Sequence, residues 1–223
     1  MRGPNLLKPG REVILKRKNS TTFKLSKAGV TTIKNSALGI LQTAATLNNS
    51  SLKKNSKLIF LTGFMGSGKT HWGKIWADAS GLYFFDLDEM IEAKQKKTIT
   101  AIFETDGEKY FRQLETETLQ AFFKKQHCII ACGGGTPCFN NNMHWMNENG
   151  TTVYFKATAL DIFKRIVTEQ EKRPLINNLP PAELLNYIEL KLKERELYYA
   201  QAKIILHVNT VTPDTIITIL KNA

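Results

Sequence analysis

Hydrophobic and polar positions alternate in blocks from residue 57 onward, and the blocks have the lengths of strands and helices. Short apolar runs typical of buried strands lie at residues 57–62, 82–85, 128–131, 152–155 and 204–208. Helical spacing of apolar residues covers 69–79, 98–125, 159–167, 181–200 and 213–221. We expect Gly107 to divide the second helix and Pro213 to lie in the first turn of the last. Strands that alternate with helices predict an α/β domain with a parallel sheet between helical layers.

The first quarter of the chain lacks this pattern. Residues 1–56 are rich in Ser, Thr, Asn and Lys, and their one aromatic residue is Phe23. Such a segment cannot bury enough apolar surface to offset the entropy lost on ordering. We therefore expect a basic, disordered extension over 1–56 and a folded domain over 57–223. The extension could be a transit peptide, or a tail that contacts nucleic acid or an acidic surface. It could also be a segment without a function, for example one added by a misassigned start codon.

Charge separates the same two regions. The chain has 31 Lys and Arg against 20 Asp and Glu, a net charge of +11. Residues 1–57 contain 12 of the basic residues and one of the acids, so the remainder has 19 of each sign. All of the basic excess except Lys57 lies outside the predicted domain, and we expect no nucleic-acid partner for that domain. No run of 18 apolar residues exists, so we also expect no membrane-spanning helix.

One loop has the signature of a phosphate-binding site. The run GFMGSGKT, residues 63–70, fits G-x-x-x-x-G-K-[ST] and lies between a predicted strand and a predicted helix. Glycines let the backbone approach phosphate oxygens, and the N–H groups at the helix start bind them. The expected ATP-binding residues of this loop are Gly63, Gly66, Ser67, Gly68, Lys69 and Thr70. The lysine reaches the β- and γ-phosphates, and the threonine hydroxyl binds Mg²⁺.

Two carboxylates follow the second predicted strand. In FFDLD, Asp86 and Asp88 come at the carboxyl end of that strand, where ligands bind in parallel sheets. Alternation along an extended segment would send both side chains to one side. One could hold the Mg²⁺ shell while the other accepts a hydroxyl proton. The alternative is a solvated turn with two surface acids.

Further candidates lie in later segments. Arg112 and Glu115 are three residues apart on one predicted helix, so Glu115 can orient a guanidinium that binds a carboxylate. An ordinary surface ion pair is the alternative. Gly133–Gly135 follow the third strand, where the backbone could contact a ligand. Arg173 lies in a polar stretch that could close over phosphates, and Arg195 lies on the long predicted helix.

The order of these motifs resembles the shikimate kinase family from residue 57 to about 220. The matching segments are GFMGSGKT, FFDLD, DGEKYFRQLE, GGGTP, RPLI and an arginine on the penultimate helix. The resemblance implies a nucleoside-monophosphate-kinase-like P-loop fold, with a five-stranded parallel sheet flanked by helices. It implies a helical substrate-binding segment at about 88–118 and a lid at about 167–178.

The resemblance also implies an activity. The family transfers the γ-phosphoryl group of ATP to the 3-hydroxyl of shikimate, with Mg²⁺, in the biosynthesis of chorismate and aromatic amino acids. We expect shikimate and ATP as ligands, a monomer and a cytoplasmic location, or a plastid location if the extension is a transit peptide. A related small-molecule P-loop kinase, such as a gluconate kinase, and a non-catalytic P-loop binding protein with a basic tail are the alternatives.

By resemblance, residues at the phosphate end take catalytic and metal-binding roles. Lys69 binds the transferring phosphoryl group, and Arg173 binds ATP from the lid and stabilises the same charge. Asp88 contacts the shikimate hydroxyls and is the candidate base. Thr70 and, through water, Asp86 hold the metal.

The acceptor end takes its roles from the same resemblance. Arg112, Arg195 and the backbone of Gly133–Gly135 bind shikimate, the two arginines chiefly at its carboxylate. Glu115 orients Arg112. A second lid arginine, for which Arg165 is the nearest candidate, stacks on adenine.

Overall fold

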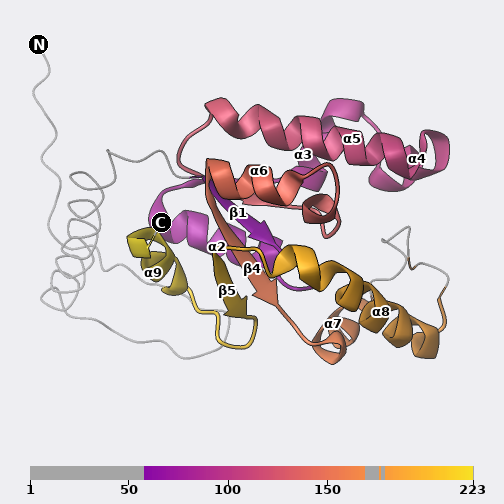
Figure 1. Ribbon diagram of the computed structural model, residues 1–223. Helices are drawn as coiled ribbons and strands as arrows, with labels where there is room; N and C mark the ends of the chain where they lie inside the picture. The colour runs from indigo at the N-terminus through magenta and orange to yellow at the C-terminus, as the bar shows by residue number, and fades with distance from the viewer. Residues whose placement is uncertain (1–57, 169–175, 177–178, 223) are drawn as a thin grey trace, which may run out of the picture. The chain divides into compact units, whose positions relative to one another are not determined.

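The computed structural model describes residues 58–168, 176 and 179–222 (Figure 1). The chain divides into two units, Met1–Asn55 and Ser56–Ala223. The first unit lies outside the described residues, as do most of the predicted lid and its arginine, Arg173. The expected disorder of residues 1–56 and the expected lid therefore stay predictions.

Five strands form the central sheet. They are β1 Leu58–Thr62, β2 Tyr83–Asp86, β3 Cys128–Ala131, β4 Thr151–Lys156 and β5 Ile204–His207. Their order across the sheet is β2-β3-β1-β4-β5, and every neighbouring pair is parallel. The predicted α/β fold with a five-stranded parallel sheet flanked by helices is confirmed.

Helices connect the strands and cover the sheet (Figure 1). They are α2 Lys69–Ser80, α3 Leu87–Gln95, α4 Ile99–Thr105, α5 Gly107–Gln120, α6 Asn142–Asn149, α7 Ala159–Ile166, α8 Pro181–Tyr199 and α9 Thr215–Asn222. Two short 3-10 helices, η2 Ala121–Lys124 and η3 Thr136–Cys138, follow α5 and β3.

Alternate residues of β1 face two separate cores. Leu58 and Phe60 pack into a cluster with buried residues of α3, α4, α5 and α6. Ile59 and Leu61 pack on the other side with Trp76 of α2 and with α9. Because both faces of the strand are covered, all five of its residues are buried, which is why it reads as a continuous apolar run. A third cluster joins Phe64 of the loop at residues 63–70, the P-loop, and Tyr154 of β4 to buried residues of α7 and α8.

Two local predictions were wrong, and helices α3 and α6 were not predicted at all. Asp86 and Asp88 do not alternate along an extended segment, because the chain turns into α3 at Leu87 and Asp86 becomes its N-cap. Pro213 precedes α9, which begins at Thr215, instead of lying in its first turn. The expected break at Gly107, whose φ is 83°, separates α4 from α5.

The carboxyl ends of β1, β2 and β3 meet at one edge of the sheet. The register pairs Ala131 with both Leu61 and Asp86, so the three strands end almost level. The connection after β1 leads to β2 on one side, whereas the connection after β3 leads to β4 on the other. Open parallel sheets bind ligands in the crevice where the connections diverge in this way. The fold thus brings the loops after β1, β2 and β3 to the expected ligand edge.

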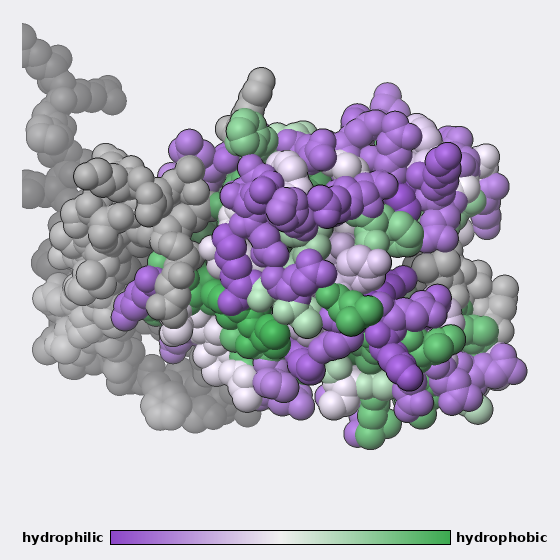
Figure 2. Space-filling model, in the orientation of Figure 1, coloured by the Kyte–Doolittle hydropathy of each residue, from purple (hydrophilic) through white to green (hydrophobic). Residues whose placement is uncertain are grey.

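Hydrophilic side chains predominate on the face shown in Figure 2, with apolar side chains in several separate groups. Such small exposed groups are ordinary on folded proteins. Among the helices of the described residues, we find none with the length and apolar character needed to cross a membrane.

Candidate active site

The loop between β1 and α2 has the conformation of a phosphate cradle. Gly63, Gly66 and Gly68 have φ values of 132°, 74° and 97°, which side chains rarely adopt. A Cβ atom on Gly63 would also lie 2.8 Å from the carbonyl oxygen of Phe155. The ammonium of Lys69 donates to the carbonyls of Gly63 and Phe64, each at 2.9 Å, and only 8% of the residue is exposed. Its charge is therefore held inside the loop, as a site for phosphate oxygens requires.

Beside this loop lies a cavity of about 490 Å³, which the ends of β2 and β3 also line and which we call the phosphate cavity. The Thr70 hydroxyl donates to Asp86 Oδ2 at 2.7 Å, and Asp86 Oδ1 accepts from the backbone of Asp88 at 3.1 Å. A hydroxyl and a carboxylate oxygen thus lie side by side at the start of α2. Mg²⁺ in nucleotide sites typically takes one or two protein oxygens and completes its shell with phosphate and water, so these residues fit it.

A second cavity of about 490 Å³, which we call the acceptor cavity, lies between α3, α4, α5 and the loop of Gly133–Gly135 after β3, the glycine-rich loop. Arg112, Glu115 and Arg195 line it, and they do not line the phosphate cavity. Four residues line both cavities: Met65, Asp88, Gly133 and Gly134. Asp88 is the ionisable group among them, so a carboxyl group lies where the two cavities meet.

The pKa of Asp88 is raised to about 7. Burial is the largest cause, followed by the carboxylates of Glu115 and Asp86, while the cations of Lys69 and Arg112 act in the opposite direction. Its Oδ1 is buried and has no hydrogen-bond partner among the described residues. A carboxyl group with a pKa near neutrality and an unpaired oxygen is suited to accept a proton.

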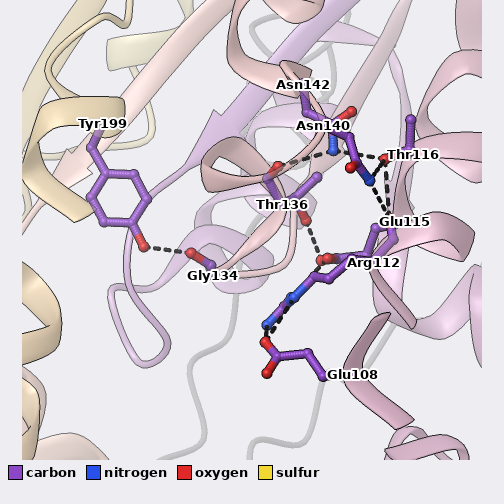
Figure 3. Close-up of polar contacts among 9 residues, drawn as sticks. All are labelled: Glu108, Arg112, Glu115, Thr116, Gly134, Thr136, Asn140, Asn142 and Tyr199. Carbon is purple, nitrogen blue, oxygen red and sulfur yellow. Dashed lines mark hydrogen bonds and ion pairs between the residues drawn. The ribbon is translucent and has the colours of Figure 1, made fainter. Parts of the chain in front are cut away.

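The guanidinium of Arg112 is held on three nitrogens (Figure 3). Nη1 donates to Glu115 Oε2 at 2.7 Å, while Nε and Nη2 donate to Glu108 Oε1 at 3.1 and 2.8 Å. The Phe139 ring lies 4.5 Å from the guanidinium carbon. Arg112 is only 6% exposed and Glu115 only 1%. The pair is therefore not the ordinary surface ion pair that the sequence left open.

The glycines after β3 are required because a side chain would not fit there, and not because of their backbone conformation. A Cβ on Gly133 would lie 2.6 Å from Glu115 Oε1 and 3.0 Å from Asp88 Oδ1. A Cβ on Gly135 would overlap the guanidinium of Arg112. Both glycines have negative φ in contrast to those of the P-loop. Their lack of side chains lets the loop approach the carboxylates and the guanidinium closely.

Two further arginines reach the cavities from α7 and α8. Arg195 on α8 lines the acceptor cavity, and its guanidinium carbon lies 5.4 Å from the centre of the Phe64 ring. Arg165 on α7 lines the phosphate cavity and donates to the carbonyls of Gly66 at 3.2 Å and Ser67 at 3.3 Å. The adenine-stacking role expected for Arg165 stays a prediction, and Arg173 lies outside the described residues.

The structure adds polar partners that the sequence analysis missed. Thr136 donates to Glu115 at 2.5 Å, and the Tyr199 hydroxyl donates to the Gly134 carbonyl at 2.5 Å. Glu108 binds Arg112 from the preceding turn. The i,i+4 spacing of Glu108 and Arg112 was a readable signal, whereas the two hydroxyl contacts join segments far apart in the chain.

Comparison with known proteins identifies the family. A family model described as shikimate kinase matches residues 65–222. The shikimate kinase of Azobacteroides pseudotrichonymphae is 44% identical over 160 residues, which are 71% of this chain and 94% of that protein. The shikimate kinase of Parabacteroides distasonis is 36% identical over 167 residues, which are 75% of this chain and 96% of that protein.

Solved structures agree with this result. The shikimate kinase structure from Bacteroides thetaiotaomicron aligns with a TM-score of 0.69 and 33% identity, over 75% of this chain and 98% of that one. The Acinetobacter baumannii enzyme, solved in complex with shikimate, aligns with a TM-score of 0.67 and 30% identity, over 76% of this chain and 93% of that one. The family match, the identities and the site geometry together establish that this chain belongs to the shikimate kinase family.

Proposed function

We propose that the chain transfers the γ-phosphoryl group of ATP to the 3-hydroxyl of shikimate, giving shikimate 3-phosphate and ADP. The main support is the meeting of two cavities at Asp88, one beside the P-loop and one lined by Arg112 and Arg195. A phosphoryl transfer needs its donor and acceptor aligned across such a junction. The structure of a relative in complex with shikimate adds support for this acceptor.

On the donor side, the proposal gives the P-loop the phosphates of ATP. The backbone from Gly63 to Gly68, Ser67 included, would bind their oxygens, and Lys69 would stabilise charge on the transferring group. Thr70 and, through water, Asp86 would hold Mg²⁺. When bound, the ion supplies positive charge to the phosphate oxygens.

On the acceptor side, Arg112 and Arg195 bind the carboxylate of shikimate, and the Gly133–Gly135 backbone lies against the ring. Asp88 contacts the hydroxyls of shikimate and accepts the proton of the 3-hydroxyl. The oxygen of that hydroxyl bonds to the γ-phosphorus as the bond from this phosphorus to ADP breaks. Glu115 orients Arg112. Arg173 stabilises the transferring phosphoryl group from the lid. We further propose a monomer in the cytoplasm, or in a plastid if the extension is a transit peptide.

An assay of ADP release with shikimate, gluconate and nucleoside monophosphates as acceptors tests the proposal. We expect turnover with shikimate to be about a hundredfold or more above that with the other acceptors. The acceptor cavity has charged and hydrogen-bonding groups, and it should reject acceptors that leave these groups unpaired. Turnover with gluconate alone would assign a related sugar-acid kinase. No turnover with any acceptor, despite ATP binding, would favour a non-catalytic binding protein.

A further inference from the structure

We propose that Thr136 is a positioning residue for the acceptor: its hydroxyl holds Glu115, and through Glu115 it holds the Arg112 guanidinium in the orientation that binds a carboxylate. The inference rests on the proposed function, because it assigns a role within the same acceptor cavity. Thr136 directly follows the three glycines, and the family resemblance gives Thr136 itself no role.

Each carboxylate oxygen of Glu115 has its own hydrogen-bond donor. Glu115 is 1% exposed, so both oxygens depend on protein partners. Oε2 accepts from Arg112 Nη1 at 2.7 Å, and Oε1 accepts from the Thr136 hydroxyl at 2.5 Å (Figure 3). The two contacts fix both ends of the carboxylate, and so fix the plane that it presents to the guanidinium.

Thr136 is itself fixed with respect to α5. It is fully buried, and its backbone N–H donates to the Gly133 carbonyl at 3.1 Å. The buried Asn142 amide donates to the Thr136 carbonyl at 3.0 Å and to the Thr116 hydroxyl at 3.1 Å (Figure 3). Because Thr116 belongs to α5, this amide joins the glycine-rich loop to the helix of Glu115. The hydroxyl of Thr136 therefore acts from a rigid support.

Loss of this hydroxyl would leave Glu115 Oε1 buried without its donor. A terminal carboxylate torsion is broad, so the group could then rotate away from Arg112. Burial already raises the pKa of Glu115, and the hydrogen bond from Thr136 opposes that rise. Glu108 would still bind Arg112, but its side chain is 52% exposed and gives a weaker hold. The expected result is a misoriented guanidinium with an intact fold.

The test compares three variants of the full chain. Thr136→Val removes the hydroxyl at nearly constant shape, and Thr136→Ser keeps it. Thr118→Val is the matched control, because Thr118 lies on α5, is 6% exposed and has a hydroxyl without a hydrogen-bond partner among the described residues. For each we measure KM for shikimate, KM for ATP, kcat and the melting temperature.

We expect Thr136→Val to raise KM for shikimate roughly tenfold or more, the effect of losing one hydrogen bond to a buried charge. KM for ATP should stay within about twofold, and Thr136→Ser and Thr118→Val should resemble the wild type. If Thr136→Val does not melt cooperatively, Thr136→Ala is compared with Thr136→Ser in its place.

Two results would overturn the inference. Unchanged KM for shikimate in the hydroxyl-free variant would show that Thr136 serves packing only. Equal increases in KM for shikimate and for ATP would show a general collapse of the site. If the wild type itself had no turnover with shikimate, the proposed function would fail together with the inference. The two earlier results are distinguishable from this one because they require an active wild type.

Discussion

At the scale of single residues, Asp88 combines proximity to both cavities with a pKa of about 7. The environment that raises this pKa also destabilises the ionised form in the folded protein. An unfolded chain would return the carboxyl to its ordinary pKa of about 4. The folded state therefore binds this proton more tightly, and its stability falls as the pH rises from about 4 through 7.

We predict that Asp88→Asn increases the free energy of unfolding at pH 8 but changes it little at pH 4, where the carboxyl is largely protonated in the folded chain and partly protonated in the unfolded chain. The upper limit of the gain is ~4 kcal/mol, since three pKa units correspond to about that energy. Urea unfolding at the two pH values measures the difference. Asp78→Asn, on the exposed side of α2, is the control and should give the same change at both. If Asp88→Asn increased the free energy of unfolding equally at both pH values, ionisation of Asp88 would not be what destabilises the folded wild type.

At the scale of elements, α8 positions Arg195 through contacts of the two residues Glu196 and Tyr199 that follow it on the helix. Glu196 accepts from the Tyr154 hydroxyl at 2.7 Å and from the Lys156 ammonium at 2.6 Å, which ties α8 to β4. Tyr199 stacks at 5.0 Å on the Tyr154 ring and reaches the Gly134 carbonyl with its hydroxyl. One end of the helix is thus joined to the glycine-rich loop of the acceptor cavity.

We predict that Tyr199→Phe raises KM for shikimate by about three- to tenfold and lowers the free energy of unfolding by about 1 kcal/mol, because the Gly134 carbonyl loses its donor. Steady-state kinetics and urea unfolding give the two values. Tyr198→Phe alters the neighbouring exposed residue and should change neither. Equal effects of the two substitutions would show that the hydroxyl contact does not position the loop.

The sequence predicted the strands and longer helices because their apolar positions repeat over whole elements. Helix α3 was missed because it starts directly after β2 and contributes only Leu87 and Ile91 as buried residues. Its signal was nevertheless present, since Asp86 and two further acids suit a helix start. Helix α6 is short and polar, and buries only Asn142, Met143 and Met146. Such a helix is stabilised by tertiary packing, and the apolar spacing of its own residues is too weak to predict it.

Site residues were predictable where a local motif required them. The P-loop and the Arg112–Glu115 spacing identified groups that the fold does bring to the cavities. Thr136 and Tyr199 were not predicted, because their partners lie 21 and 65 residues away in the chain. A hydrogen bond between distant segments depends on the packing of the loops, for which one sequence has no periodic signal.

At the scale of the whole molecule, the charge of the chain and the charge of the site are separate properties. The net charge of +11 belongs to residues 1–57, whereas the remainder has 19 residues of each sign. The cations that face the cavities, including Lys69, Arg112 and Arg195, are local exceptions in a balanced domain. We therefore expect anion binding at the cavities to need no contribution from the basic extension.

We predict that removal of residues 1–56 leaves kcat, both KM values and the melting temperature almost unchanged. The reason is that the described residues, which begin at 58, supply a P-loop, the linings of two cavities and three apolar cores. Parallel kinetics and thermal melts of the full and shortened chains make the comparison. A large loss in either would show that the extension packs on the domain.

The central claim is that phosphoryl transfer takes place at Asp88, with this carboxylate as the base. The most direct measurement is the pH profile of kcat/KM for shikimate, in the wild type and in Asp88→Asn. A base must be ionised, so we predict that wild-type activity falls about tenfold per unit as the pH drops below about 7. Asp88→Asn should lose about a thousandfold in kcat while it still binds ATP. Wild-type turnover in that variant would contradict the account.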